Sequence, residues 1–227
     1  DKNFRTIEKE RFIDKVSGYK LFGSYILPKS NSVTSEKFII NKIKKLIPKV
    51  DVIIISDYGH HFLSKNIARA IINSKKFVSV NAQINSSTHG YNNIKKYTNA
   101  NAVIINETEL RQELRDNISD LKYLSKKFKK ERNIKELIIT SGKNGVMLLD
   151  KNFKIYHCPA FATRTVDKIG SGDAMLSLIS LGLKLKLDPK IILYLGSIAA
   201  AISVETIGNK KSIIFEDLDR SIEYMFK

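Results

Sequence analysis

Four short apolar segments, separated by stretches with helical periodicity, constrain the fold more than any other feature of the sequence. They cover residues 50–56, 77–81, 102–105 and 136–140. Each is too short to be a typical helix and is rich in β-branched residues, which is the pattern of a strand buried on both faces. Such strands alternating with helices predict an α/β fold, in which helices cover both faces of a largely parallel sheet.

Other elements follow from capping residues and periodicity. Thr34 can cap a helix that runs to about residue 45, and Ser64 can cap one that runs to about residue 74. Residues 82–99 form a polar loop with one helical turn, and residues 1–31 are expected to be irregular or rich in strands. Further helices are predicted at 107–115, 118–130, 171–187, 189–205 and from residue 216, and a strand pair at 146–149 and 154–157.

The composition limits the classes of partner. The net charge of +16 comes from 39 Lys and Arg against 23 Asp and Glu, but the lysines are spread through nearly every segment. Their densest stretch, residues 122–132, is explained by a solvated helix face. We therefore expect no nucleic-acid partner, although a steep salt dependence of duplex binding would support one. No apolar run reaches about 18 residues, which predicts a cytoplasmic protein without a membrane helix.

The segment 166–174 carries the clearest chemistry. Gly170 and Gly172 flank Ser171 at the start of a long apolar helix, where close backbone approach and the helix dipole would form an anion hole for a phosphate. Asp173 would repel a resting phosphate, so its position makes sense if it takes a proton from an attacking hydroxyl during phosphoryl transfer. By spacing alone, an ordinary glycine-rich helix start with an acidic first turn explains these residues equally well.

Residues 167–173 resemble the D-x-x-G-A/S-G-D signature of the ribokinase-like (PfkB) sugar kinases. Residues 106–109 resemble the N-x-x-E motif of that family, and residues 140–145 resemble its T-x-G-x-x-G nucleotide loop. The order of the three motifs is that of the family, and each lies near the end of a predicted strand. Segments 56–60 and 80–97 are most similar to the heptose-kinase branch, whose kinase domains are fused to, or encoded with, a sugar-phosphate cytidylyltransferase.

The resemblance implies a three-layer, ribokinase-like α/β/α fold and ATP-dependent phosphorylation of a sugar or sugar phosphate. Asp173 would be the general base, and the backbone N–H groups of Gly170, Ser171 and Gly172 would stabilise the transferring phosphoryl group. Asn106 and Glu109 would organise Mg²⁺ and the phosphates, mainly through water. Asn106 and Glu109 also have the spacing of a helix capping box, and that alternative stays open.

The resemblance also implies roles for residues outside the anion hole, although residues 140–142 could equally be an ordinary turn. The nucleotide is expected at Thr140, Gly142, Gly145, Ser197 and Gly208. A monovalent cation such as K⁺ is expected at Asp167 and at the carbonyl of Ile169. The sugar is expected at Asp57, Asn81 and Gln83. Residues 81–83 read Asn-Ala-Gln where related heptose kinases have Asp-Pro-Lys, so amide recognition of hydroxyls would replace charged contacts.

The chain departs from the family by lacking a Gly-Gly segment, so we expect it to be the C-terminal part of a longer kinase with the N-terminal part absent. Residues 1–31 would be a lid-like or irregular segment, and residues 32–227 the nucleotide-binding and catalytic domain. A fused or associated nucleotidyltransferase is the expected partner, and a homodimer stays open. The alternative function is a non-catalytic nucleotide-binding or scaffold domain of a sugar-nucleotide biosynthesis protein.

Overall fold

A six-stranded sheet forms the centre of the protein. The computed structural model describes residues 6–15, 20–26, 33–60, 62–83, 94–162, 170–205 and 212–225. The strands lie side by side in chain order: β3 (Val52–Asp57), β4 (Phe77–Ala82), β5 (Ala102–Asn106), β6 (Glu136–Thr140), β7 (Val146–Leu149) and β8 (Ile155–Cys158). β3 to β6 are parallel, whereas β7 runs antiparallel to both of its neighbours. The predicted α/β fold with a largely parallel sheet is confirmed.

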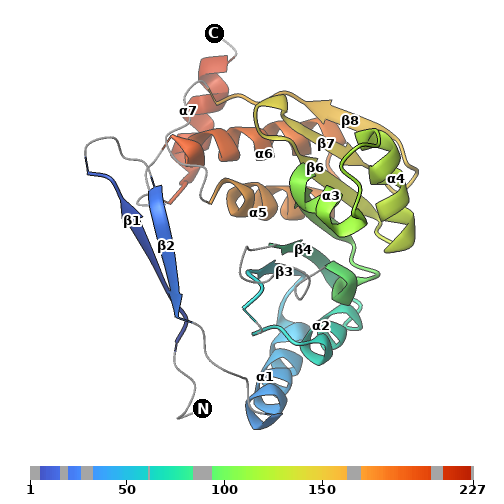
Figure 1. The fold of residues 1–227 in the computed structure, drawn as a ribbon. Coiled ribbons are helices and arrows are strands. Elements are labelled where there is room, and N and C mark those ends of the chain that lie inside the picture. The colour runs from blue at the N-terminus through green and yellow to red at the C-terminus, as the bar shows by residue number, and fades with distance from the viewer. Residues whose placement is uncertain are drawn as a thin grey trace.

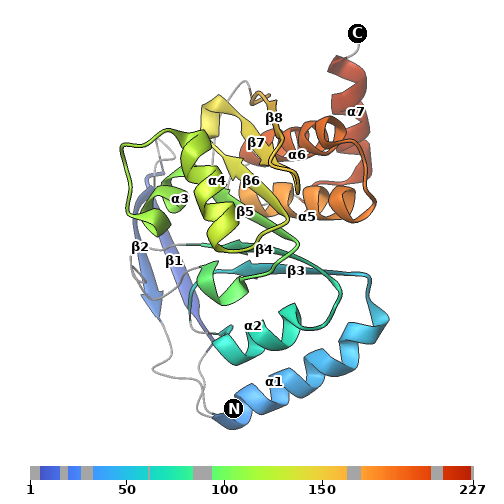
Figure 2. The same ribbon diagram turned by 90° about the vertical axis from the view of Figure 1, so that its right-hand side faces the viewer.

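Helices cover both faces of this sheet. They are α1 (Val33–Leu46), α2 (Lys65–Ile72), α3 (Glu107–Leu114), α4 (Leu121–Glu131), α5 (Ser171–Lys184), α6 (Pro189–Val204) and α7 (Phe215–Met225). Figure 2 shows α5 and α6 on one side of the strands and α3 and α4 on the other. No helix in the described ranges has both the length and the apolar character needed to span a bilayer.

Alternation of side chains along the strands builds two separate cores. On β5, Val103 and Ile105 belong to the core that includes side chains of α2, α3 and α4. Ala102 and Ile104, the alternate residues of the same strand, pack with side chains of α5 and α6. These four residues are at most 2 % exposed, and full burial of a branched aliphatic side chain contributes about 1.5–3 kcal/mol. The apolar run of this strand is therefore explained by burial on both faces.

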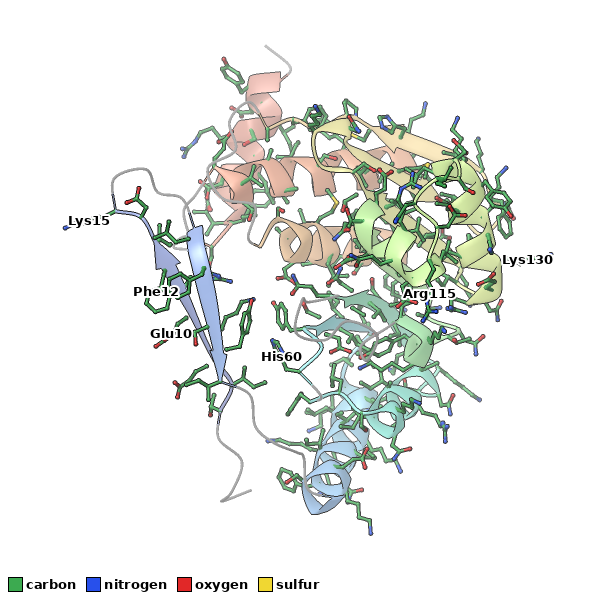
Figure 3. All side chains as sticks on the ribbon, viewed as in Figure 1. Glu10, Phe12, Lys15, His60, Arg115 and Lys130 are labelled. Carbon is green, nitrogen blue, oxygen red and sulfur yellow. The ribbon has the colours of Figure 1, made fainter. Side chains whose placement is uncertain are left out.

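An antiparallel hairpin stands beside the main body (Figure 1). It consists of β1 (Glu8–Ile13) and β2 (Lys20–Ile26). The rings of Phe12 and Phe22 stack with centroids 4.3 Å apart, although both side chains are about half exposed. The ring of Tyr25 lies 6.0 Å from that of His60, which follows β3. Figure 3 shows His60 on the side of the body that faces the hairpin.

The prediction of a helix starting at residue 118 was wrong by three residues. The Asp116 carboxylate accepts hydrogen bonds from the backbone N–H groups of Ile118 and Ser119. These bonds close a turn where the helix was predicted to begin. The helix α4 begins only at Leu121, because Asp120 caps it by accepting a hydrogen bond from the N–H of residue 123. A local side chain therefore competed successfully with helical periodicity.

Glu136, the first residue of β6, has a half-buried acidic side chain. Burial raises its pKa to about 7. The nearby Asp150 carboxylate contributes to this rise, and Lys129 opposes it. Burial also lowers the pKa of Lys129, whose Nζ donates a 2.8 Å hydrogen bond to the carbonyl of Ile134. The fold therefore favours the protonated form of Glu136.

This preference gives a pH-dependent stability. The pKa of Glu136 is higher in the folded than in the unfolded protein. Its contribution to the free energy of unfolding is therefore complete at a pH below the ordinary pKa of a glutamate, and it is lost as the pH rises through about 7. Glu136→Gln should raise Tm by about 2–4 °C at about pH 8, roughly 1 kcal/mol after solvent screening, and by much less at about pH 5. Thermal unfolding at both pH values measures this, with exposed Glu223→Gln as the control. An equal gain at both pH values would contradict the explanation.

Candidate active site

The carboxyl ends of four parallel strands meet at one edge of the sheet. Asp57 and Ala82 pair at the ends of β3 and β4, and Asn106 and Thr140 pair at the ends of β5 and β6. The first turn of α5 reaches the same edge, where Asp173 contacts residues at the end of β3. Loops at this edge of an open α/β sheet form its usual ligand site.

Two hydroxyl groups hold the Asp173 carboxylate. Ser56 Oγ donates a 2.6 Å hydrogen bond to Oδ1, and Tyr58 OH donates a 2.9 Å hydrogen bond to Oδ2. Burial raises the pKa of Tyr58, and the Asp173 carboxylate raises it further against the opposing effect of Ser56. The Tyr58 hydroxyl therefore remains a hydrogen-bond donor near neutral pH. Asp173 itself is half-buried, so its carboxylate is held in place without being sealed from solvent.

The start of α5 has the backbone features expected of an anion site. Gly170 is its N-cap residue and has φ +85°, a left-handed conformation that a glycine adopts without strain. Gly170 has no side chain with which to cap the helix, and the N–H groups of a first helical turn lack intrahelical acceptors. A Cβ added to Gly172 would meet no atom within 4 Å, so the space beside this turn is open. Ser171 lies between these two glycines in the same turn.

Asn106 and Glu109 form a complete capping box at the start of α3. The Asn106 side chain accepts a 2.8 Å hydrogen bond from the N–H of Glu109, and the Glu109 carboxylate accepts one of 3.1 Å from the N–H of Asn106. Glu109 is buried, whereas Asn106 is exposed at the sheet edge. The capping alternative is therefore real, and it fixes the two side chains that the family motif assigns to Mg²⁺.

The loop after β6 is a tight turn in which two glycines have positive φ. Gly142 has φ +54° and Gly145 has φ +85°. Ser141 N donates a 2.9 Å hydrogen bond to the carbonyl of Gly145, which closes the turn after Thr140. A Cβ added to Gly145 would lie 2.2 Å from the carbonyl oxygen of Cys158 on β8, so only glycine fits there.

An ionic network ties this turn to α3. Ser141 Oγ donates a 2.9 Å hydrogen bond to one oxygen of Glu107, and Arg111 donates two hydrogen bonds, at 2.9 and 3.1 Å, to the other. Arg111 also donates to the carbonyl of Ser119. The network holds the two candidate phosphate loops against each other. Ser141 and Glu107 are 34 residues apart in the chain, so no local sequence pattern predicts their contact.

Asp57, one of the predicted sugar contacts, is only 4 % exposed and is fully engaged with the protein. Its Oδ2 lies 2.6 Å from Nζ of Lys96 and accepts a 2.7 Å hydrogen bond from Tyr97 OH. Its Oδ1 accepts a hydrogen bond from the N–H of Gly59. These contacts support a structural role for Asp57 and do not favour its predicted contact with the sugar.

The other predicted ligand contacts differ in where they lie. Asn81 is half-buried, and its Nδ2 donates to the carbonyl of Ile104. Gln83 is half-buried at the end of β4, and its backbone N–H donates to the carbonyl of Asp57. Ser197 is 4 % exposed inside α6, and its contact with the purine stays a prediction. Three further predictions, for Asp167, Ile169 and Gly208, lie outside the described residues.

Ser56 and Tyr58 are the site residues that sequence reasoning missed. Side chains alternate between the two faces of a strand, so Ser56 and Asp57 at the end of β3 point to opposite faces, and Ser56 lies on the face that meets α5. Tyr58 directly follows the strand and bonds the same carboxylate as Ser56. The period-two pattern could have shown that Asp57 and its neighbours have different surroundings. Their partner, Asp173, could not be found this way because it lies 115–117 residues away.

The two residues predicted to bind Mg²⁺ have oxygen atoms as their possible metal ligands. The side chains of Asn106 and Glu109 present amide and carboxylate oxygens, which are the donors that Mg²⁺ prefers together with water and phosphates. Within the described ranges, no cluster of three or more His, Cys, Asp or Glu side chains could hold a metal ion by itself. The residues therefore fit a Mg²⁺ ion that is shared with water and a phosphorylated ligand.

The fold is that of the ribokinase-like proteins. The structure superposes on ribokinase from Thermotoga maritima with a TM-score of 0.73 at 20% identity, covering 96% of this chain and 70% of that one. It superposes on phosphofructokinase-2 from Escherichia coli, solved in complex with potassium, with a TM-score of 0.75 at 11% identity and the same coverage. Residues 22–214 match the profile of the pfkB family of carbohydrate kinases, and the chain belongs to this family.

Two curated relatives with one name are longer than this chain. The chain is 30% identical over 180 residues to "Bifunctional protein HldE" of Campylobacter curvus, and 28% identical over 174 residues to the protein of that name in Campylobacter fetus. The matches cover 78% and 75% of this chain but 37% of each relative. The chain therefore spans well under half the length of these relatives.

The close approach at Gly145 gives a stability prediction. Gly145→Ala should lower Tm by about 5 °C or more, because the added Cβ meets a backbone carbonyl and φ +85° costs an L-residue roughly 1–3 kcal/mol. Thermal unfolding measures the change. Gly172→Ala is the matched control and should leave Tm unchanged or slightly raised, since open space surrounds its Cβ. A Gly145→Ala protein as stable as wild type would show that the β6 turn is not packed as described.

Proposed function

We propose that the protein phosphorylates a hydroxyl group of a sugar or sugar phosphate with ATP as donor. The observation that carries the proposal is the Asp173 carboxylate in the first turn of α5, held by two hydroxyls at the carboxyl edge of the sheet. A carboxylate beside an anion-binding helix start is unfavourable for phosphate binding alone. It is useful where a proton must leave an attacking hydroxyl beside a phosphoryl group.

In the proposed reaction, the acceptor hydroxyl of the sugar binds beside Asp173. Its oxygen attacks the γ-phosphorus of ATP in line as its proton passes to the Asp173 carboxylate, and the bond to the β–γ bridging oxygen breaks to release ADP. The N–H groups of Gly170, Ser171 and Gly172 stabilise the charge on the transferring phosphoryl group. Each such donor is commonly worth about 10²–10³-fold in rate.

The rest of the edge is assigned to the donor nucleotide. Thr140, Gly142 and Gly145 would line its phosphates and ribose, and Asn106 with Glu109 would hold Mg²⁺ through water. When bound, Mg²⁺ neutralises phosphate charge. From β3 to β6 this edge extends for roughly 14 Å at the usual strand spacing, which leaves room for a sugar at one end and a nucleotide at the other. The proposed monovalent cation at residues 167–169 would lie next to the anion hole in the chain.

A heptose phosphate is the proposed acceptor, because the curated relatives share one bifunctional name and the β3 segment resembles the heptose-kinase branch. Asn81 and Gln83 would contact sugar hydroxyls through their amides.

A nucleotidyltransferase is the proposed fused or associated partner, in the cytoplasm. The half-exposed aromatic pair Phe12 and Phe22 supports a homodimer in which a second copy covers the hairpin.

Removal of the proposed general base gives the first test. Asp173→Asn should reduce kcat by about 10²–10⁴-fold while leaving Tm and ATP binding close to wild type, because the amide has nearly the same shape. An ADP-release assay across pentoses, hexoses, heptoses and their phosphates measures this. Exposed Asp219→Asn on α7 is the control. A variant that keeps more than about a tenth of wild-type turnover would exclude Asp173 as the base.

The same assay separates the alternative function. A non-catalytic nucleotide-binding or scaffold domain would bind ATP without releasing ADP on any sugar of the panel. The preserved Asp173 and the complete helix start around it favour catalysis, since a scaffold has no need for a carboxylate beside bound phosphate. ATP binding measured by calorimetry, together with an inactive sugar panel, would establish the alternative.

Glu109→Gln tests the proposed Mg²⁺ role apart from helix capping. Glutamine can keep the capping-box hydrogen bond to the N–H of Asn106 but removes the charge near the metal. The variant should keep its Tm within about 2 °C and need about tenfold more Mg²⁺ for half-maximal ADP release. Magnesium titrations of the wild type and the variant measure this. An unchanged Mg²⁺ requirement would leave Glu109 as a capping residue only.

A further inference from the structure

We propose that Ser56 and Tyr58 are positioning residues that fix the orientation of the Asp173 carboxylate toward the acceptor hydroxyl. This inference rests on the proposed function, because it assigns a task to the surroundings of the proposed base. Ser56 Oγ and Tyr58 OH each donate to a different oxygen of the carboxylate, at 2.6 and 2.9 Å. Two donors on two oxygens fix both the position and the plane of a group whose terminal torsion is otherwise broad.

The two donors come from a rigid support. Ser56 is an interior residue of β3, and its backbone is paired with Asn81 of β4. Tyr58 directly follows the strand, and its side chain reaches the same carboxylate of α5 as Ser56 does. The Asp173 carboxylate therefore joins β3 to the start of α5. A shift of the strand or of the helix would turn this carboxylate away from the acceptor hydroxyl.

A buried cluster on the opposite face of β3 fixes the same backbone. Asp57, between the two donors, forms an ion pair with Lys96 at 2.6 Å and accepts a 2.7 Å hydrogen bond from Tyr97 OH. The other carboxylate oxygen of Asp57 accepts a hydrogen bond from the N–H of Gly59, the residue after Tyr58. Burial and the Asp57 carboxylate both raise the pKa of Tyr97, which keeps that hydroxyl a donor. This cluster holds the turn that carries Tyr58.

The arrangement leaves room for catalysis. A carboxylate has about four lone-pair sites, and two hydroxyl donors use two of them. An acceptor hydroxyl can therefore still bind to Asp173 and transfer its proton. The two hydroxyls therefore hold the carboxylate without occupying the positions that the acceptor needs.

Three variants test the proposal kinetically. Tyr58→Phe and Ser56→Ala should each lower kcat about tenfold with KM for ATP changed less than about twofold, and Ser56→Thr should restore most of the loss because it keeps a hydroxyl. Tyr123→Phe, an exposed tyrosine on α4, is the control. An unchanged kcat in Tyr58→Phe and Ser56→Ala, or a Ser56→Thr variant as slow as Ser56→Ala, would overturn the proposal.

A double-mutant cycle distinguishes positioning from a general structural effect. In an Asp173→Asn background, Tyr58→Phe should cost less than about twofold, because the group it orients no longer acts as a base. A full tenfold cost in that background would place the action of Tyr58 elsewhere and overturn the proposal.

A readout without turnover keeps this proposal separate from the proposed function. The orientation of the Asp173 carboxylate can be read from crystal structures of wild type and of the Ser56→Ala/Tyr58→Phe double variant, where loss of both donors should leave the carboxylate in more than one orientation. A single orientation identical to that of wild type would overturn the positioning role even in an active enzyme. A wild-type protein that releases no ADP on any sugar would instead refute the proposed function, whatever orientation the carboxylate has.

Discussion

Parallel pairing of β3, β4, β5 and β6 is the constraint on which the rest of the structure depends. Parallel strands cannot be joined by tight hairpins, so a crossover that contains a helical segment joins β3 to β4, β4 to β5 and β5 to β6, and the sheet must be covered on both faces. The two cores and the helices on each side follow from this requirement. The same pairing brings the carboxyl ends of four strands to one edge of the sheet, which is the candidate site.

The chemistry of that edge depends on contrasts between neighbouring groups. The start of α5 favours negative charge through its dipole and its first N–H groups, and Asp173 brings a carboxylate to the same place. Hydroxyl donors from β3 hold that carboxylate at distances of 2.6 and 2.9 Å. Across the sheet, the capping box of α3 and the network through Glu107 hold two further loops. The loop backbones are fixed, as preorganised electrostatic stabilisation requires.

Local features of this fold were predictable from the sequence, whereas contacts distant in the chain were not. The strands, the Ser64 cap and the pairing of Asn106 with Glu109 depend on residues within a few positions of each other. The turn at 116–119 was missed because a carboxylate competed with helical periodicity. The engagement of Asp173 by Ser56 and Tyr58 and the burial of Asp57 depend on tertiary packing, which one sequence does not encode as a pattern.

A crystal structure with a sugar phosphate and a non-hydrolysable ATP analogue bound together would test the proposed site most directly. The acceptor hydroxyl oxygen should lie within about 3 Å of the Asp173 carboxylate. The γ-phosphate should lie at the N–H groups that begin α5, with Ser56 and Tyr58 still bonded to Asp173. A γ-phosphate bound away from α5, or an acceptor hydroxyl out of reach of Asp173, would contradict the proposed site.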